Sequence, residues 1–268
     1  MADLASVITS LGITETEAIL ALKSARASKP KHPQLTGKHN KFKYGYISDT
    51  HIGHKTFDEA LFDYAASRFK QEKVDFILHP GDHLEGMSGR PGHIYELSEI
   101  GFEQQFERAL KLYKRLPAQI YGIDGNHDQW YYQKNNGGVI VGKELERQLP
   151  NFTHLGEWEG DLAVDKIRIK LFHANDGTAY AHSYKLQKLI ESFSGGEKPH
   201  IVHSGHYHKF LYMFLRNVHG FESGTLAGQS IFMRGKKLAA HKGFGINTVE
   251  YNSGGISSLR QEFVPAYE

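Results

Sequence analysis

Short apolar runs alternate with segments of helical periodicity along most of the chain, and this alternation constrains the fold more than any other feature. From Lys43 onward the runs have the length of buried strands, and apolar residues between them recur every three or four positions. The pattern is typical of α/β proteins, in which helices cover a largely parallel sheet. It predicts strands at 43–48, 74–79, 118–123, 166–172 and 199–204, and helices at 57–73, 99–116, 143–148 and 182–192. After Lys209 only strands and turns are expected.

The first 42 residues have a different character. Residues 1–28 show the spacing of a helical hairpin, and Thr14-Glu15-Thr16-Glu17 has a capping-box pattern. So small a hairpin buries too little surface to be stable alone, so we expect it to dock on something. Residues 29–42 contain two prolines and several lysines and are expected to be a basic linker. The main domain is therefore expected over 43–268.

The composition excludes several classes of protein and of site. With 40% hydrophobic and 23% charged residues, 268 residues suffice for one substantial core. No apolar run is long enough to cross a membrane, and no charged leader precedes an apolar segment, so we expect a cytoplasmic protein with no membrane partner. There is no cysteine, which excludes disulfides, thiolate metal sites and cysteine nucleophiles. Any metal must therefore be held by nitrogen and oxygen ligands.

Basic charge is concentrated before the main domain. The net charge is +2, but residues 18–48 contain no acidic residue and carry seven cations: Lys23, Arg26, Lys29, Lys31, Lys38, Lys41 and Lys43. Such a stretch can neutralise backbone phosphates, so we expect segment 18–48 to contact nucleic acid, with a solvated tether as the alternative. A second basic group is expected at the rim of a hairpin; it consists of Arg234, Lys236, Lys237 and Lys242.

Side chains that can bind metal follow each of the five predicted strands. They are Asp49 and His51, Asp82, then Asn126, His127 and Asp128, then His173, and finally His206 and His208. Open α/β sheets place their ligand sites at the carboxyl ends of strands. Each residue taken singly has an ordinary structural explanation, such as a helix cap for Asp49 or a turn for Asn126. Together they predict a divalent metal site at one edge of the fold.

These residues stand in five ordered blocks: Asp49-Thr50-His51, Gly81-Asp82, Gly125-Asn126-His127-Asp128, His173, and Gly205-His206-Tyr207-His208. In this order the chain resembles the calcineurin-like metallophosphoesterases over residues 43–251. The resemblance implies a four-layer αββα sandwich of two mixed sheets flanked by helices, here with a small N-terminal helical extension.

The resemblance also implies a pair of divalent cations, with manganese expected and iron, zinc, nickel or magnesium as alternatives. One cation would be held by Asp49, His51, Asp82 and His208, and the other by Asp82, Asn126, His173 and His206. Asp176 or His154 is the alternative to His173. Two cations about 3.5–4 Å apart would lower the pKa of a shared water and aim the resulting hydroxide at phosphorus.

The same resemblance assigns catalytic roles to the pair after Asn126. His127 is expected to contact the phosphate and to protonate the leaving oxygen as a general acid. Asp128 is expected to orient the His127 ring and to raise its pKa.

Further side chains are candidates for substrate contact. His54 is a candidate phosphate donor, and Asn126 and His127 are expected to touch substrate. His83 directly follows the bridging aspartate and is expected to contact substrate or to form a hydrogen bond behind the ligands. Three aromatic residues could stack a base or belong to the core: Trp130, Tyr131 and Tyr132.

Details of the motifs reduce the number of activities that the family resemblance allows. Protein phosphatases of this family carry Gly-Asp-x-x-Asp-Arg-Gly, whereas this chain has Gly-Asp-His-Leu-Glu-Gly at 81–86. Asp-Thr-His-Ile-Gly at 49–53 looks more like the DNA exonuclease and polymerase small-subunit members. We therefore expect hydrolysis of phosphodiester bonds in DNA or nucleotides. The alternatives are a small-molecule phosphodiesterase or monoesterase, and a catalytically silent module that binds nucleic acid or a partner.

Overall fold

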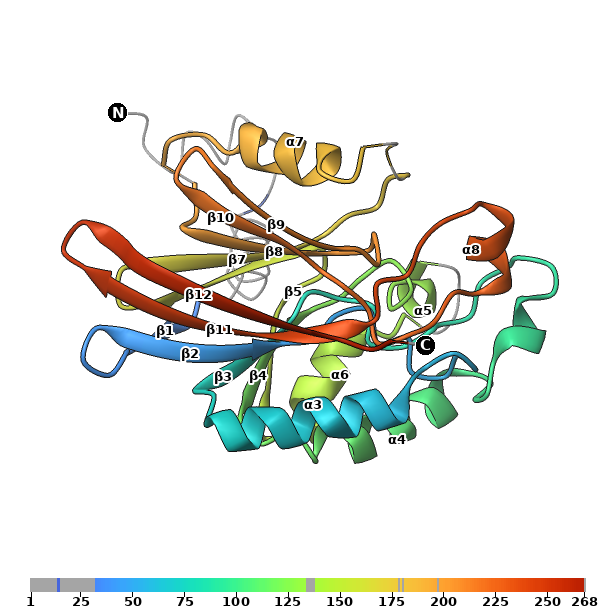
Figure 1. Ribbon diagram of the computed structural model, residues 1–268. Helices are drawn as coiled ribbons and strands as arrows, with labels where there is room; N and C mark the ends of the chain where they lie inside the picture. Colours follow the sequence, from blue (N-terminus) through green and yellow to red (C-terminus); the bar gives the residue numbers. More distant parts are fainter. Residues whose placement is uncertain are drawn as a thin grey trace. The chain divides into compact units, whose positions relative to one another are not determined.

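Two six-stranded sheets lie face to face at the centre of the molecule (Figure 1). The computed structural model describes residues 14, 32–133, 138–177, 179, 181–196 and 198–267. The hairpin expected at 1–28 lies outside this part of the chain, apart from Thr14. Described residues from His32 onward belong to one unit.

The first sheet contains, in spatial order, β1 (Gln34–Leu35), β6 (Glu159–Val164), β7 (Ile167–His173), β8 (Ile201–Gly205), β10 (Val218–Ser223) and β9 (Phe210–Leu215). The second contains β12 (Gly255–Pro265), β11 (Gly243–Asn252), β2 (Lys41–Tyr46), β3 (Phe76–His79), β4 (Gln119–Ile123) and β5 (Phe152–Gly156). Strands β2 to β5 run parallel to one another, as do β7, β8 and β10. β11 pairs antiparallel with β2, and β9 pairs antiparallel with β10. Both sheets are therefore mixed.

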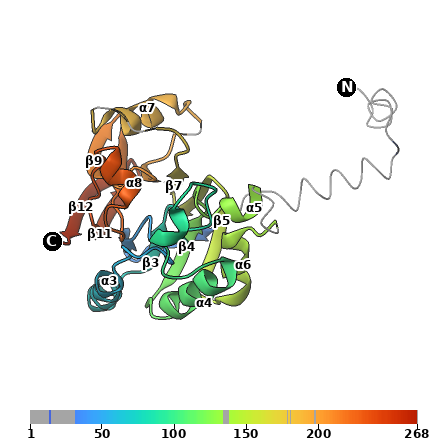
Figure 2. The ribbon, with the colours of Figure 1, turned by 90° about the vertical axis from the view of Figure 1, so that its right-hand side faces the viewer.

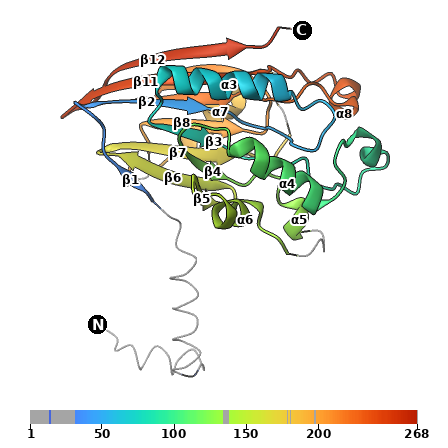
Figure 3. The same cartoon turned by 90° about the horizontal axis from the view of Figure 1, so that it is seen from below.

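Helices cover the outer faces and complete four layers. Figure 3 shows α3 (Glu59–Glu72), α4 (Phe102–Tyr113) and α6 (Val141–Gln148) on the second sheet, and Figure 2 shows α7 (Tyr184–Ser192) on the first. One apolar cluster fills the space between the sheets, a second lies under α3, α4 and α6, and a third lies under α7. The expected αββα sandwich is confirmed.

Local sequence explains how the helices lie so close to the sheet. The carboxylate of Asp58 accepts a hydrogen bond from the Leu61 amide at 2.9 Å and caps α3, which ends at Lys73 in the left-handed conformation. Gly45 on β2 faces this helix. A Cβ at Gly45 would lie 2.6 Å from the Phe69 ring, so glycine allows α3 to pack against the strand.

From Lys43 onward every predicted strand and helix is present, with boundaries that differ by a few residues, but other elements were missed. β5 and β6 were not predicted. The segment after Lys209, expected to hold only strands and turns, contains the short helix α8 (Ile231–Gly235), which the Ser230 hydroxyl caps by accepting from the Met233 amide. Two further short helices were not predicted either: η1 (His93–Glu96) and α5 (Trp130–Gln133).

The expected basic linker at 29–42 overlaps the sandwich. Its residues Gln34 and Leu35 pair with β6, and β2 already begins at Lys41. Two of the seven cations of segment 18–48 form ion pairs within the domain: Lys41 Nζ lies 3.0 Å from Glu250, and Lys43 Nζ lies 2.8 Å from Glu72. In the described part of the chain, no helix has both the length and the apolar character needed to cross a membrane.

A buried polar network ties the two sheets together. The Tyr44 hydroxyl on β2 lies 3.0 Å from His203 Nε2 on β8 and accepts a hydrogen bond from Asn247 Nδ2 at 2.8 Å. His203 Nδ1 lies 3.1 Å from the Ser223 hydroxyl. Tyr44, His203 and Asn247 have no exposed surface. Because burial penalises the imidazolium form, it lowers the pKa of His203 to about 3.

We expect Tyr44→Phe to lower the free energy of unfolding by about 1–3 kcal/mol, because it leaves His203 and Asn247 buried without this partner. Urea unfolding of the metal-free protein measures the change. Tyr95→Phe is the control, since Tyr95 is 79% exposed and its hydroxyl can bond to water. Equal stability of the two variants would show that the network does not hold the sheets together.

His203 also predicts a pH dependence of stability. Its folded pKa lies below the ordinary value of 6.5, so the unfolded chain takes up a proton that the folded chain excludes. This contribution is complete above pH 6.5 and is lost as the pH falls toward 3, at about 1.4 kcal/mol per pH unit. Between pH 7 and pH 5 wild type should therefore lose about 1–2 kcal/mol more than His203→Gln. Parallel stability curves for the two proteins would contradict this.

Candidate metal centre

The loops after β2, β3, β4, β7 and β8 meet at one edge of the sandwich. Five of the predicted ligands in these loops adopt left-handed backbone conformations, with φ from 47° to 85°: Asp49, His51, Asp82, His206 and His208. A residue with a Cβ pays for this conformation in steric strain, and such strain concentrates at functional sites. The strand ends thus turn sharply enough to direct the side chains inward.

A first group of potential ligands consists of Asp49, His51, Asp82 and His208, whose ligand atoms all lie within 4.8 Å of one another. The Nε2 atoms of His51 and His208 are 2.9 Å apart. His208 Nε2 lies 3.3 Å from Asp49 Oδ1, and His51 Nε2 lies 3.7 Å from Asp82 Oδ2. Four donors from three loops therefore converge on a volume that one cation could fill.

A second group shares Asp82 with the first and adds His173 and His206. His173 Nε2 lies 3.3 Å from Asp82 Oδ2. The amide oxygen of Asn126 joins this group, at 3.0 Å from His173 Nε2 and 2.8 Å from His206 Nδ1. The structure thus brings all seven predicted ligands together, with the Asp82 carboxylate between the two groups.

The alternatives to His173 lie elsewhere. His154 Nε2 is 3.1 Å from Asp124 Oδ2, and the Asp176 carboxylate contacts Lys185 and the Tyr207 hydroxyl. Asp176 contacts a ligand through its backbone oxygen, which lies 2.9 Å from His206 Nε2. Neither side chain joins the ligand groups.

The donor set fits a cation. Each of three histidines directs its outer ring nitrogen to an oxygen acceptor: His51 Nδ1 to Glu85 Oε2 at 2.8 Å, His173 Nδ1 to the Pro80 oxygen at 2.7 Å, and His206 Nε2 to the Asp176 oxygen. With a hydrogen on the outer nitrogen, each ring could present the lone pair of its inner nitrogen to a cation, the arrangement found in metal-bound histidines. Asp49 and Asp82 are buried, and histidines are their ion-pair partners within the described residues.

Glycines in the motif blocks allow this crowding. A Cβ at Gly81 would lie 2.3 Å from His173 Nδ1, and one at Gly125 would lie 2.2 Å from Asp82 Oδ1. Gly81 also has a φ of 101°, which residues with a side chain rarely adopt. The glycine before Asp82 and the glycine before Asn126 are therefore required by the packing of the ligands themselves.

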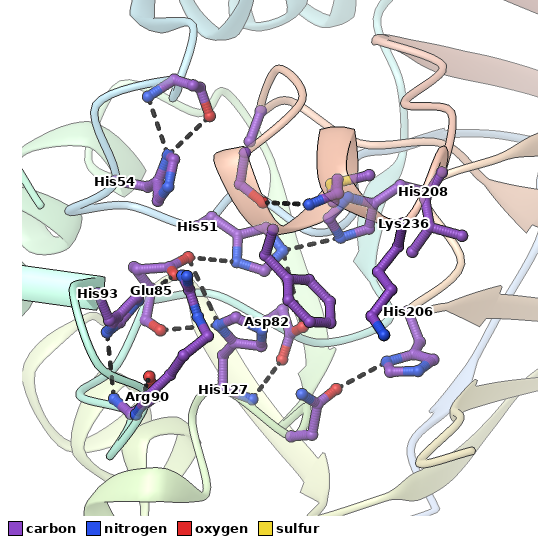
Figure 4. Close-up of a pocket in the computed structure, with 18 of the residues that line it drawn as sticks. His51, His54, Asp82, Glu85, Arg90, His93, His127, His206, His208 and Lys236 are labelled. Carbon is purple, nitrogen blue, oxygen red and sulfur yellow. Dashed lines mark hydrogen bonds and ion pairs between the residues drawn. The ribbon is translucent and has the colours of Figure 1, made fainter. Parts of the chain in front are cut away.

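Glu85 occupies a central position that the sequence reading missed. Its buried carboxylate lies 2.7 Å from His93 Nε2, 2.8 Å from His51 Nδ1 and 3.4 Å from His127 Nδ1 (Figure 4). Burial by itself would raise the pKa of Glu85, but these three histidines hold it well below its ordinary value. The signal was an acidic residue three positions after Asp82, at the place where the protein phosphatases carry aspartate. His93 gave no comparable signal.

The expectation for Asp128 was wrong, whereas His127 lies at the site. The Asp128 carboxylate accepts hydrogen bonds from the backbone amides of His83, Leu84 and Gly125 at 2.9–3.0 Å and shapes the loops. His127 Nδ1 instead lies 2.8 Å from the Glu85 backbone oxygen. Burial alone would lower the pKa of His127, but the charges of Glu85 and Asp82 raise it to about 10.

The expectation that His83 contacts substrate was also wrong. Its ring is fully buried, with Nδ1 2.7 Å from the Tyr113 hydroxyl and Nε2 2.9 Å from the Ile123 oxygen. Burial lowers its pKa to about 4, so the ring is neutral. His83 is a core residue because the strand end directs it into the helix layer rather than toward the ligands.

A cavity of about 660 Å³ opens in front of the ligand groups (Figure 4). Asn126, His127 and His54, three of the candidates for substrate contact, line it. Of the three candidate aromatic residues, Trp130 lines this cavity, and its ring centroid lies 4.0 Å from that of His127. Tyr131 is buried and donates to Gln105 Oε1 at 3.0 Å, so the core alternative holds for this residue.

A four-layer sandwich that gathers histidine, aspartate and asparagine at its strand ends defines a metallophosphoesterase. The family model of the calcineurin-like phosphoesterase superfamily domain matches residues 42–232. The chain belongs to this superfamily, as its five motif blocks predicted.

Known proteins with similar sequences include DNA polymerase II small subunits. The chain is 23% identical over 250 residues to the DNA polymerase II small subunit of Methanothermobacter thermautotrophicus, covering 76% of this chain and 52% of that protein. It is 24% identical over 254 residues to the same subunit of Archaeoglobus fulgidus, covering 78% and 51%. The chain thus spans about half the length of these relatives.

Similar solved structures include an archaeal phosphodiesterase, with 17% identity, a TM-score of 0.48, and coverage of 83% of this chain and 99% of that one. Another is Vps29 of Entamoeba histolytica solved with zinc, with 13% identity, a TM-score of 0.45, and coverage of 83% and 98%.

We expect Glu85→Gln to weaken binding of Mn²⁺ by about 10- to 100-fold, because the substitution loosens the carboxylate–histidine contact that orients His51. Calorimetric titration of the metal-free protein with Mn²⁺ measures the affinity. Glu107→Gln on the exposed surface of α4 is the matched control and should bind as wild type does. Unchanged affinity in Glu85→Gln would show that this contact does not orient a metal ligand.

Proposed function

We propose that the protein hydrolyses phosphodiester bonds with two divalent cations, manganese being the expected pair. The observation that carries this proposal is the Asp82 carboxylate, which belongs to both ligand groups. Asp49, His51, Asp82 and His208 would hold one cation, and Asp82, Asn126, His173 and His206 the other. When bound, the cations would neutralise charge on the phosphoryl oxygens and lower the pKa of a water molecule.

His127 is proposed as the general acid. Its Nδ1 is engaged by the Glu85 oxygen, and its backbone amide donates to Asp82 Oδ1 at 2.8 Å. Nε2 is therefore the ring atom left to meet substrate. The negative charges of Glu85 and Asp82 favour the protonated ring. An imidazolium at this position can donate a hydrogen bond to the phosphate and a proton to the leaving oxygen.

The proposed substrates are DNA or nucleotides. Support comes from the similarity to DNA polymerase II small subunits, from the Asp-Thr-His-Ile-Gly motif at 49–53, and from the basic segment 18–48. Because the chain spans about half of those relatives, nuclease activity and nucleic-acid binding are proposals for this chain. We also propose a location in the cytoplasm, supported by the similarity to DNA polymerase II small subunits.

We expect His127→Asn to lower kcat for bis-p-nitrophenyl phosphate and end-labelled single-stranded DNA by roughly 10²- to 10⁴-fold in the presence of Mn²⁺, because the variant lacks the proton donor. It should still bind two equivalents of Mn²⁺. Asp82→Asn and wild type in EDTA should be inactive. The matched control is His182→Asn, which replaces an exposed histidine outside both the cavity and segment 18–48.

Undiminished turnover in His127→Asn or Asp82→Asn would refute this mechanism. Two bound metal equivalents with no activity on any phosphoester would instead support a catalytically silent module.

A further inference from the structure

The outer wall of the cavity is built by two segments that lie far apart in the sequence, η1 with its preceding loop and α8. Glu96 on η1 joins them. Its buried carboxylate pairs with Arg90 at 2.5 Å and accepts a hydrogen bond from the Ile231 amide at the start of α8 at 3.1 Å. The backbone oxygen of Glu96 also accepts from the Lys55 amide at 2.9 Å. The wall is therefore a connected part of the fold.

This wall presents an aromatic face to the cavity. Phe232 on α8 lines the cavity and is 46% exposed, and the Arg90 guanidinium lies 5.6 Å from its ring centroid. Trp130 lines the same cavity beside His127. One aromatic side chain is thus adjacent to the proposed phosphate-contacting residue, and another lies on the outer wall. Flat rings left accessible in a cavity are suited to stacking against a planar ligand.

Polar groups with unused capacity lie around these rings. Lys236 lines the cavity and extends toward His206 (Figure 4), and it takes part in none of the ion pairs found among the described residues. His54 is 5% exposed, and its Nε2 atom makes no hydrogen bond within the described chain, although it lies 3.5 Å from Glu96 Oε2. A ligand with an anionic part and a planar ring bearing hydrogen-bonding atoms would use each of these features.

We propose that the outer cavity binds the base of a nucleotide whose phosphate lies at the ligand groups, with Phe232 and Trp130 as the stacking surfaces. The position of the phosphate rests on the proposed function. A volume of about 660 Å³ admits one small ligand, whereas a base within a duplex is stacked and paired. The substrate class is therefore a free nucleotide or an unpaired strand end. A phosphopeptide or a glycerol phosphodiester need not contain a planar base.

The test compares adenosine 5′-monophosphate with ribose 5-phosphate, which has the same sugar and phosphate but a hydroxyl at C1′ in place of the base. Calorimetry on the Mn²⁺-loaded protein should show roughly 5- to 150-fold tighter binding of the nucleotide, the range that base stacking supplies. Phe232→Ala should lower affinity for the nucleotide by a factor in this range and leave ribose 5-phosphate unchanged. Ile231→Ala is the matched control, because this neighbouring side chain is 72% exposed and does not line the cavity.

Equal affinity of wild type for the two ligands, or no binding of either, would overturn the inference. So would an equal loss of nucleotide affinity in Ile231→Ala, which would indicate a change in the helix rather than loss of a stacking ring. Hydrolysis of bis-p-nitrophenyl phosphate by the same samples separates this inference from the proposed function. Tighter binding of the nucleotide without hydrolysis would support the base-binding site and contradict the proposed hydrolase activity. Hydrolysis without tighter binding of the nucleotide would support the hydrolase activity and contradict the base-binding site.

Discussion

The Asp82 carboxylate is the group on which the site depends. It is buried, it accepts a hydrogen bond from the His127 amide, and it lies within reach of histidines in both ligand groups. A carboxylate buried among imidazoles is costly unless positive charge accompanies it, and two cations on either side would supply that charge. The glycines that approach Asp82 and His173, and the left-handed turns at the strand ends, serve to place this one group.

Glu85 is a second buried carboxylate surrounded by histidines, and it lies between the ligand groups and the outer wall of the cavity. It holds His51 through Nδ1, faces His127, and is itself held by His93 from η1. A single carboxylate therefore connects a proposed metal ligand, the proposed general acid and the loop that begins the outer wall. Because Glu96 connects that loop to α8, the ligand groups and the proposed base-binding wall belong to one continuous network.

The sequence predicted the elements that carry the site better than those around it. The strands before Asp49, Asp82 and Asn126 were found because apolar runs ending in a polar cluster are distinctive. β5 and β6 were missed because neither is a continuous apolar run: β5 (FTHLG) has polar residues between its two large apolar side chains, and β6 (EGDLAV) begins with two acidic residues among its first three positions. Helix α8 was missed because five residues cannot show a helical period, and its start is set by a single cap at Ser230.

In the site, too, the sequence predicted some features and the tertiary structure decided others. Which residues could bind a metal followed from residue type and order, because ligand chemistry and the turn requirements of glycine are properties of short segments. Only the tertiary structure decided which neighbours those residues meet. Asp128 directly follows His127 in the sequence and Glu85 lies 42 positions before it, yet the Asp128 carboxylate faces backbone amides and the Glu85 carboxylate faces three histidines, His127 among them. These contacts depend on the paths of separate loops, which local sequence does not determine. The contact between Arg90 and Phe232, which are 142 positions apart in the chain, depends on loop paths in the same way.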